Sequence, residues 1–96
     1  MGAIRQIIKR DGRCTEFHIE KIADAIYKAA AVLGGKDHDM ALELAQKVEQ
    51  YMIDSGLSDS PTVEQIQDAV EKVLIENGHA RTAKEYILYR AERTRI

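Results

Sequence analysis

The stretch IIKRDGRCTEFHIEKI, residues 7–22, determines the first structural element of this chain. Two strand-like runs, residues 3–10 and 13–18, flank the dipeptide Asp11-Gly12. Asp-Gly between such runs favours a hairpin with a two-residue turn, in which both turn residues need positive φ. Strands this short need a larger body to pack on. We therefore predict an N-terminal β-hairpin that lies on the rest of the chain.

Four amphipathic segments follow this hairpin. Apolar residues recur at helical spacing in each segment, and Gly-Gly, Ser-Gly or Asn-Gly pairs separate the segments. The expected inward stripes are Ile19, Ile22, Ala23, Ile26, Ala30 and Leu33; Ala41, Leu44, Ala45, Val48 and Met52; Ile66, Ala69, Val70, Val73 and Leu74; and Ala83, Ile87 and Ala91 with the ring of Tyr86 or Tyr89. The pattern predicts an α+β fold that is mostly α: a small four-helix bundle covered by an N-terminal β-hairpin or a short three-stranded sheet.

Capping signals indicate where three of the helices begin. A side-chain oxygen at the N-cap accepts a hydrogen bond from a free amide of the first turn, and a Gln or Glu three residues later completes a capping box. The expected caps are Asp37 or Asp39 for the second helix, Thr62 with Gln65 for the third, and Thr82 with Glu85 for the fourth. Before the third helix, the polar loop LSDSP, residues 57–61, is the expected mobile connection.

Length and charge narrow the class of protein. The 96 residues suit one domain, 1–96. The 14 basic and 16 acidic residues give a net charge of -2, which argues against bulk attraction to nucleic acid or to an anionic membrane. A single cysteine, Cys14, fits a reducing compartment, and no apolar run is long enough to span a membrane. We therefore expect a cytoplasmic domain with no membrane contact.

Catalytic and metal-binding motifs are missing from the sequence. It has no Gly-x-Ser-x-Gly elbow and no His-Glu-x-x-His pair. The Gly-Lys of LGGKDHD, residues 33–39, lacks the spacing of a phosphate loop, so we interpret it as a loop that ends a helix. Cys14 and His18 share a strand face, but a structural zinc site needs about four ligands. We expect neither a catalytic centre nor a metal site.

Cations gather around the hairpin turn. Lys9 and Arg10 are expected on opposite faces of the first strand, and Lys21 in the first turn of the first helix. A cation in that turn is unfavourable for the helix dipole, whereas a phosphate there would satisfy free amides and offset the charge. In the alternative interpretation this is a solvated face, on which the cations pair with Glu16, Glu20 and Asp24.

A second group of cations lies on the fourth helix. It comprises Arg81, Lys84, Arg90, Arg93 and Arg95. Arg90 and Arg93 share a helix face because they are three residues apart. This group is either a solvated helix face, which can serve as a surface between subunits or domains, or a further anion-binding element.

Four quoted segments together resemble a known family. IIKRDGR, FHIEKIADAIYKAA, PTVEQIQDAVEKVLIENG and YILYRAERTRI resemble the ATP-cone domain, a nucleotide-binding regulatory module at the N-terminus of many ribonucleotide reductases. The resemblance covers nearly the whole chain. It implies a small helical bundle covered by a short sheet, which agrees with the independent reading above. It also implies that the domain binds ATP or dATP with Mg²⁺ and has no catalytic centre of its own.

The resemblance further implies roles for particular residues. Lys9, Arg10 and Lys21 would hold the triphosphate, Ile8, Phe17, Ile22 and Val63 would shape the base pocket, and Gln67 would approach the base or the sugar. His18 would lie near the nucleotide, and Arg90 or Arg93 would reach the phosphates from the fourth helix. In such a reductase, ATP favours activity and dATP switches it off through a change in quaternary structure. The expected partners are therefore adenine nucleotides and the catalytic domain or subunits of a reductase, and a homo-oligomer is left open.

Three other functions compete with this one. A related cone occurs in a zinc-ribbon repressor of reductase genes, but this chain lacks the Cys-x-x-Cys ribbon. A nucleic-acid-binding helical module could use the C-terminal arginines, but the net acidity of the chain counts against it. A degenerate cone that serves only as a docking surface would not need Lys9, Arg10 and Lys21, which are all present.

Overall fold

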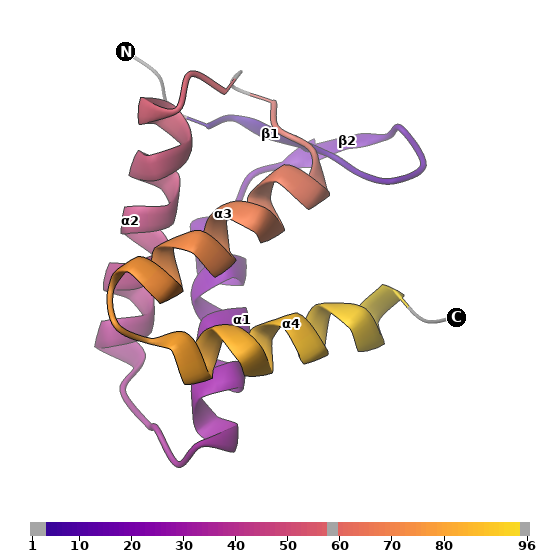
Figure 1. Cartoon of the computed structure of the whole chain (residues 1–96). Coiled ribbons are helices and arrows are strands. Elements are labelled where there is room, and N and C mark those ends of the chain that lie inside the picture. Colours follow the sequence, from indigo (N-terminus) through magenta and orange to yellow (C-terminus); the bar gives the residue numbers. More distant parts are fainter. Residues whose placement is uncertain (1–3, 58–59, 95–96) are drawn as a thin grey trace.

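The computed structural model describes the backbone of residues 4–57 and 60–94, and side chains as far as residue 91. The element order is β1 (Gln6–Ile8), β2 (Cys14–Glu16), α1 (Ile19–Val32), α2 (His38–Asp54), α3 (Val63–Glu76) and α4 (Ala80–Thr94). Helix α1 packs on α2, α3 packs on α2, and α4 packs on both α3 and α1 (Figure 1). The predicted α+β fold, a four-helix bundle with an N-terminal hairpin, is confirmed.

The hairpin forms where Asp11-Gly12 predicts it, but its turn is of a different type. Strands β1 and β2 are antiparallel, with Ile7 opposite Thr15. The amide of Gly12 donates to the carbonyl of Lys9 at 2.9 Å, and Gly12 has a φ of 89°. Among the described residues only glycines have positive φ, so the expected two-residue turn is wrong. A turn followed by a left-handed glycine is instead the pattern of a three-residue hairpin loop.

This turn changes the place of two cations. Strand β1 ends at Ile8, so Lys9 and Arg10 lie in the turn and not on opposite faces of a strand. The physical reason is the extra turn residue, which needs positive φ at Gly12 alone and leaves Asp11 in an ordinary conformation. Both side chains are exposed at the tip of the hairpin.

The hairpin is joined to the start of α3. Ile8 forms an isolated parallel bridge with Thr62, and the amide of Ile8 donates to the carbonyl of Pro61 at 3.0 Å. The described sheet therefore has two strands, and the one bridge to Thr62 extends it beside β1. As a result, the hairpin, the N-terminus of α1 and the N-terminus of α3 meet at one edge of the bundle (Figure 1).

The apolar stripes of α1, α2 and α3 form the core. Every residue of the stripes expected for α2 and α3 is buried, and so are Ile22, Ala23, Ile26 and Ala30 of α1. The inclusion of Leu33 was wrong, because α1 ends at Val32 and Leu33 is the C-cap with 46% of its surface exposed. The Gly-Lys segment lies between α1 and α2 as a helix-ending loop, in which Gly34 has a φ of 92°.

The caps of α2 and α3 follow the sequence signals. Asp37, rather than Asp39, caps α2 by accepting from the amide of Met40 at 2.9 Å. Thr62 and Gln65 form the predicted capping box on α3, with both hydrogen bonds present. Ser58 and Asp59 of the loop expected to be mobile lie outside the described residues.

The prediction for α4 was partly wrong. This helix begins at Ala80, and the amide of Ala83 donates to the carbonyl of His79, so Thr82 lies inside the first turn and does not form a capping box with Glu85. The cause is the short connection: Gly78 ends α3 with a φ of 82°, and α4 begins two residues later. The inward residues are Ala83 and Tyr86, with Tyr89 half-buried, and they follow i, i+3 spacing. The other two expected positions, Ile87 and Ala91, are exposed.

Candidate functional site

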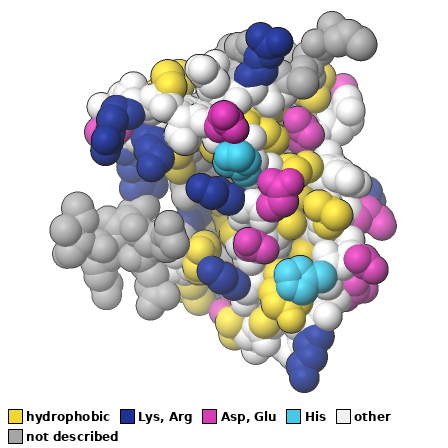
Figure 2. Space-filling view, turned by 180° about the vertical axis from the view of Figure 1, so that it is seen from behind, with side chains coloured by type: hydrophobic (Ala, Val, Ile, Leu, Met, Phe, Trp, Pro, Cys, Tyr) yellow, Lys and Arg dark blue, Asp and Glu magenta, His cyan; other side chains and the backbone are white. Residues whose placement is uncertain are grey.

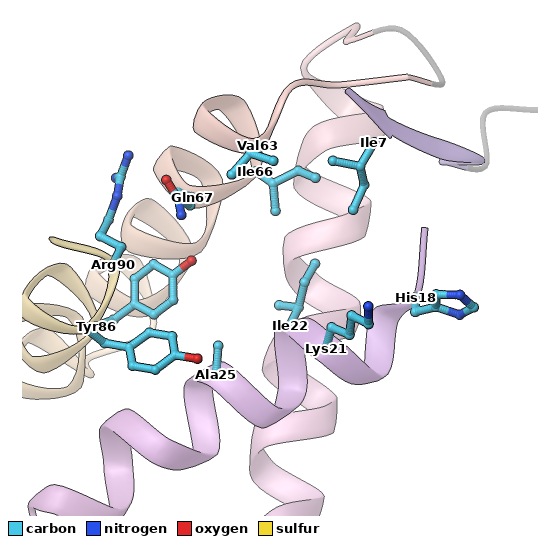
Figure 3. Close-up of a pocket in the computed structure, with 11 residues that line it drawn as sticks. Ile7, His18, Lys21, Ile22, Ala25, Val63, Ile66, Gln67, Tyr86 and Arg90 are labelled. Carbon is cyan, nitrogen blue, oxygen red and sulfur yellow. The ribbon is translucent and has the colours of Figure 1, made fainter. Parts of the chain in front are cut away.

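A cleft of about 180 Å³ opens where the hairpin, α1, α3 and α4 meet (Figure 3). Six of the residues expected to bind a ligand line it: His18, Lys21, Ile22, Val63, Gln67 and Arg90. They come from the start of α1, the first turns of α3 and the middle of α4, which lie far apart in the sequence. The fold thus brings together residues that were selected from three separate segments.

The other expected residues lie elsewhere. Ile8 is turned to the bridge with Thr62, and Phe17 packs against the core, so neither lines the cleft. Lys9 and Arg10 lie in the hairpin turn, outside the lining of the cleft. The side chain of Arg93 is outside the described residues.

Five lining residues were not predicted: Ile7, Ala25, Ile66, Tyr86 and Tyr89. Ile7 replaces Ile8 because adjacent strand residues face opposite sides, and an apolar pair does not say which member faces inward. For Tyr86 and Tyr89 the sequence pattern predicts only a place in the core. Their signal was the pair of amphipathic rings at i, i+3, each with an apolar body and a polar tip.

The cleft has an apolar floor and polar ends. Ile7, Ile22, Val63 and Ile66 present aliphatic side chains toward the space between α1 and α3 (Figure 3). Lys21 and His18 lie at the end nearest the hairpin, whereas Gln67, Arg90 and Tyr86 lie at the end nearest α4. A flat apolar group could be enclosed in the middle, with polar groups at both ends.

Further cations are exposed on the hairpin, outside the lining of the cleft. Arg10 pairs with Glu64 at 2.6 Å between Nε and Oε2, and Arg13 pairs with Asp11 at 2.7 Å. In the described part of the chain, Lys9 and Lys21 have no ion-pair partner within 4.0 Å. Figure 2 shows Lys and Arg side chains gathered at the edge that carries the hairpin turn.

The ion pairs of the hairpin arginines differ from those that the interpretation as a solvated face predicts. The expected partners were Glu16, Glu20 and Asp24, but the arginines pair with Glu64 and Asp11 instead. Hydrogen bonds from the amide and then the guanidinium of Arg13 lower the pKa of Asp11. Arg10 and Arg13 are therefore neutralised locally, whereas Lys9 and Lys21 remain available to attract a ligand.

The N-terminus of α1 borders the cleft without a side-chain cap. His18 occupies the N-cap position and makes no side-chain capping bond, and its Nε2 lies 3.5 Å from Glu16. Lys21 lies in the first turn, where the helix dipole already carries partial positive charge. An anion at this end would satisfy first-turn amides and reduce the repulsion between Lys21 and the dipole.

Arg90 is held by two acidic residues of α3. Its Nη1 lies 3.2 Å from Oδ1 of Asp68 and makes a second bond to Oε1 of Glu71. The side chain of Arg90 is only 20% exposed. Burial lowers the pKa of Arg90, but the hydrogen bonds to Glu71 and Asp68 outweigh that effect and raise it.

Two further polar groups on this side of the cleft are buried. Tyr86 is 5% exposed, and burial raises its pKa to about 12. Oε1 of Gln67 is buried and has no hydrogen-bond partner among the described residues. A buried acceptor without a donor costs about 1–3 kcal/mol, so a ligand that donates to Gln67 would gain from that contact.

Comparisons with known proteins relate the sequence of this chain to one family. Residues 5–95 match the family model of the ATP cone domain. A vitamin B12-dependent ribonucleoside-diphosphate reductase of Thermoplasma acidophilum is 41% identical over 97% of this chain and 12% of its own length. An anaerobic ribonucleoside-triphosphate reductase of Haemophilus influenzae is 36% identical over 91% of this chain and 12% of its own length. A ribonucleoside-diphosphate reductase subunit alpha of Chlamydia pneumoniae is 33% identical over 98% of this chain and 10% of its own length. The chain therefore spans about a tenth of the curated relatives it matches.

Proposed function

This chain belongs to the ATP-cone domain family, and on that basis we propose that it is a regulatory module that binds ATP or dATP and controls a ribonucleotide reductase. One observation carries the proposal beyond the family match. Lys21 and the uncapped N-terminus of α1 lie at one end of an apolar cleft, so a flat base and a polyanion could be bound side by side.

The cleft suggests how the nucleotide would lie. The base would pack between Ile22, Val63 and Ile66, and the sugar would approach Gln67. The triphosphate would extend past Lys21 toward the hairpin turn, where Lys9 and Arg10 are exposed. Charge-assisted hydrogen bonds from lysine to phosphate are roughly twice as strong as neutral ones. Mg²⁺ would be held chiefly by phosphate oxygens and water, as is usual for this ion.

Arg10 would have to change partners to contact a phosphate. It now pairs with Glu64 in the first turn of α3, and both side chains are about half exposed. An exposed pair of this kind is worth only about 0–1 kcal/mol. A triphosphate could therefore draw Arg10 away from Glu64 at small cost.

Regulation would be exerted on a much larger protein. Because the chain is about a tenth of its relatives, the catalytic domain or subunits of a reductase would be the partners that respond to the nucleotide. ATP and dATP must bind two states of the assembly with different affinities, because a ligand with equal affinity for both states shifts nothing. The two nucleotides would thereby select different quaternary structures of a cytoplasmic enzyme, and copies of the domain itself could take part in that contact.

Thermal unfolding of the isolated chain tests this function. A ligand that binds only the folded state stabilises it by about 2.7 kcal/mol at a hundredfold excess over Kd. We expect ATP and dATP with Mg²⁺ to raise the unfolding temperature, and a short DNA duplex to leave it unchanged. Absence of any shift at millimolar ATP and dATP would contradict the proposal, and a shift with DNA alone would favour a nucleic-acid-binding module.

A further inference from the structure

We propose that Arg90 is a positioning residue: with Asp68 and Glu71 it forms a clamp that sets the spacing of α3 and α4, and it does not bind the triphosphate. This inference rests on the proposed function, since the clamp matters for a nucleotide held in the cleft. It differs from the role that the sequence suggested for Arg90, which was a phosphate ligand on α4.

The contacts of Arg90 direct it toward the two acidic residues of α3. Nη1 is bonded to both Asp68 and Glu71. The side chain is four-fifths buried between the two helices. In Figure 3 Arg90 extends along the α3 side of the cleft, away from Lys21 and His18. A triphosphate that follows Lys21 toward the hairpin would therefore run away from the guanidinium.

The charge around Arg90 also opposes an anion. One guanidinium faces two carboxylates, so the group as a whole carries a net charge of about −1 at neutral pH. A phosphate next to it would meet both carboxylates as well as the arginine. If Arg90 were removed, Asp68 and Glu71, which lie one turn apart on α3, would lose the cation that pairs with both of them.

The position of the clamp explains what it would control. Asp68 follows Gln67 on α3, and Arg90 follows Tyr89 on α4. Gln67 lines the cleft from α3, and Tyr89 lines it from α4. The bond between Asp68 and Arg90, which directly follow these two residues, fixes the distance between α3 and α4 at this point of the cleft. The clamp would therefore shape the part of the cleft that encloses the base and the sugar.

A comparison of the affinities for ATP and for adenosine distinguishes a positioning role of Arg90 from direct contact with phosphate. We expect Arg90→Met and Glu71→Gln each to lower the affinity for both ligands by the same factor, roughly threefold to thirtyfold, as measured by calorimetry. The ratio of the ATP and adenosine affinities should stay at its wild-type value. The double variant should bind no more weakly than the weaker single variant, because the two residues act through one bond. Arg90→Lys should recover part of the loss, since it keeps one carboxylate partner.

A phosphate ligand would give the opposite pattern and overturn the inference. Arg90→Met would then weaken ATP and leave adenosine unchanged, and Glu71→Gln would strengthen ATP by releasing the guanidinium. Asp37→Ala serves as the matched control, because it removes the cap of α2, which does not line the cleft. That variant should lower thermal stability and leave both affinities unchanged.

The spacing of the helices tests the clamp without any nucleotide. Spin labels at the exposed positions 72 on α3 and 87 on α4, in a Cys14→Ser background, report the distance between the helices. We expect Arg90→Met and Glu71→Gln to broaden the distribution of this distance or to increase its mean. An unchanged distance would refute the clamp even if nucleotides bind. If the wild-type chain bound neither ATP nor adenosine, the proposed function would fail, and the spacing alone would decide the clamp.

Discussion

Two lysine side chains carry the charge that the cleft can offer to a ligand. Lys21 lines the cleft, and Lys9 is exposed on the hairpin turn above it. Arg10 and Arg13 are each paired with a carboxylate, whereas Lys9 and Lys21 have no ion-pair partner among the described residues. An anion bound at this end of the cleft would therefore be attracted by cations that are not already paired.

Loss of either lysine should weaken nucleotide binding without unfolding the domain. A charge-assisted hydrogen bond to phosphate is worth about 1.5–3 kcal/mol, so we expect Lys9→Ala and Lys21→Ala to lower the affinity for ATP about tenfold or more. Exposed substitutions usually change the free energy of unfolding by no more than about 0.5 kcal/mol. Lys28→Ala, farther along α1 and outside the cleft lining, is the control and should bind normally. Calorimetry that shows wild-type affinity in both lysine variants would place the phosphates elsewhere.

Tyr86 makes the stability of the fold depend on pH in the alkaline range. Burial raises its pKa from 10.0 to about 12 in the folded state, so the protonated form is favoured there. Its contribution is fully present below pH 10 and is lost as the pH rises toward 12. This rise in the pKa corresponds to a loss of about 2.7 kcal/mol in the free energy of unfolding once the pH exceeds both values. The free energy of unfolding of the wild type should fall relative to that of Tyr86→Phe across this window, in urea titrations at each pH. A difference that stays constant from pH 8 to 12 would show that Tyr86 ionises as freely in the folded chain as in the unfolded one.

At the scale of elements, the start of α3 connects the bundle to the hairpin. Thr62 caps α3 through its side chain, and its backbone forms the bridge to Ile8. The capping box satisfies two groups that would otherwise lack partners at the helix N-terminus. One residue thus fixes both the beginning of a helix and the position of a sheet edge.

Removing this cap should destabilise the domain measurably. We expect Thr62→Ala to lower the free energy of unfolding by about 0.5–2 kcal/mol, and Thr62→Ser, which keeps the hydroxyl, to lower it much less. Urea unfolding monitored by circular dichroism measures both variants. Equal stability of Thr62→Ala and the wild type would mean that the box contributes nothing beyond the backbone bridge.

Sequence pattern predicted these elements well wherever one face of a helix is buried along its whole length. The stripes of α2 and α3 and the capping box at Thr62 were read correctly because periodicity and capping are local properties. Thr82 was misread because a capping box looks the same whether the helix begins there or one turn earlier. The start of α4 depends on how tightly the chain reverses after Gly78, which is a tertiary property.

The residues around the cleft were harder to predict for a related reason. His18, Lys21 and Gln67 could be selected from the family motifs, and the fold brings them together. Which of Ile7 and Ile8 faces the cleft depends on the register of the hairpin against α3. The bonds of Arg90 to Asp68 and Glu71 join residues of two helices, and no spacing within one helix reveals such a contact.

At the scale of the whole molecule, a domain of this size can regulate only by changing its contacts with something larger. No helix in the described ranges is long and apolar enough to cross a membrane. Exposed apolar side chains, including Val32, Ile87 and Leu88, lie on α1 and α4 and provide surface for contacts with other protein. Nucleotide-dependent contacts of this kind would connect the cleft to the quaternary structure of the enzyme.

Self-association of the domain should therefore depend on the nucleotide. We expect sedimentation velocity to give different distributions with ATP and with dATP, because a regulatory ligand must favour one of two states. The apo sample provides the reference distribution. Identical distributions in all three samples would mean that the switch requires the remaining part of a reductase.

A titration of the ¹⁵N-labelled domain with Mg·ATP, followed by amide chemical shifts, tests most directly whether this cleft binds the nucleotide. We expect the largest changes on the hairpin turn, on the first turns of α1 and α3, and on residues near Gln67 and Tyr89. Amides of α2, which does not line the cleft, should move little. Unchanged spectra at millimolar ATP, or changes concentrated on α2, would contradict the claim that this cleft binds an adenine nucleotide.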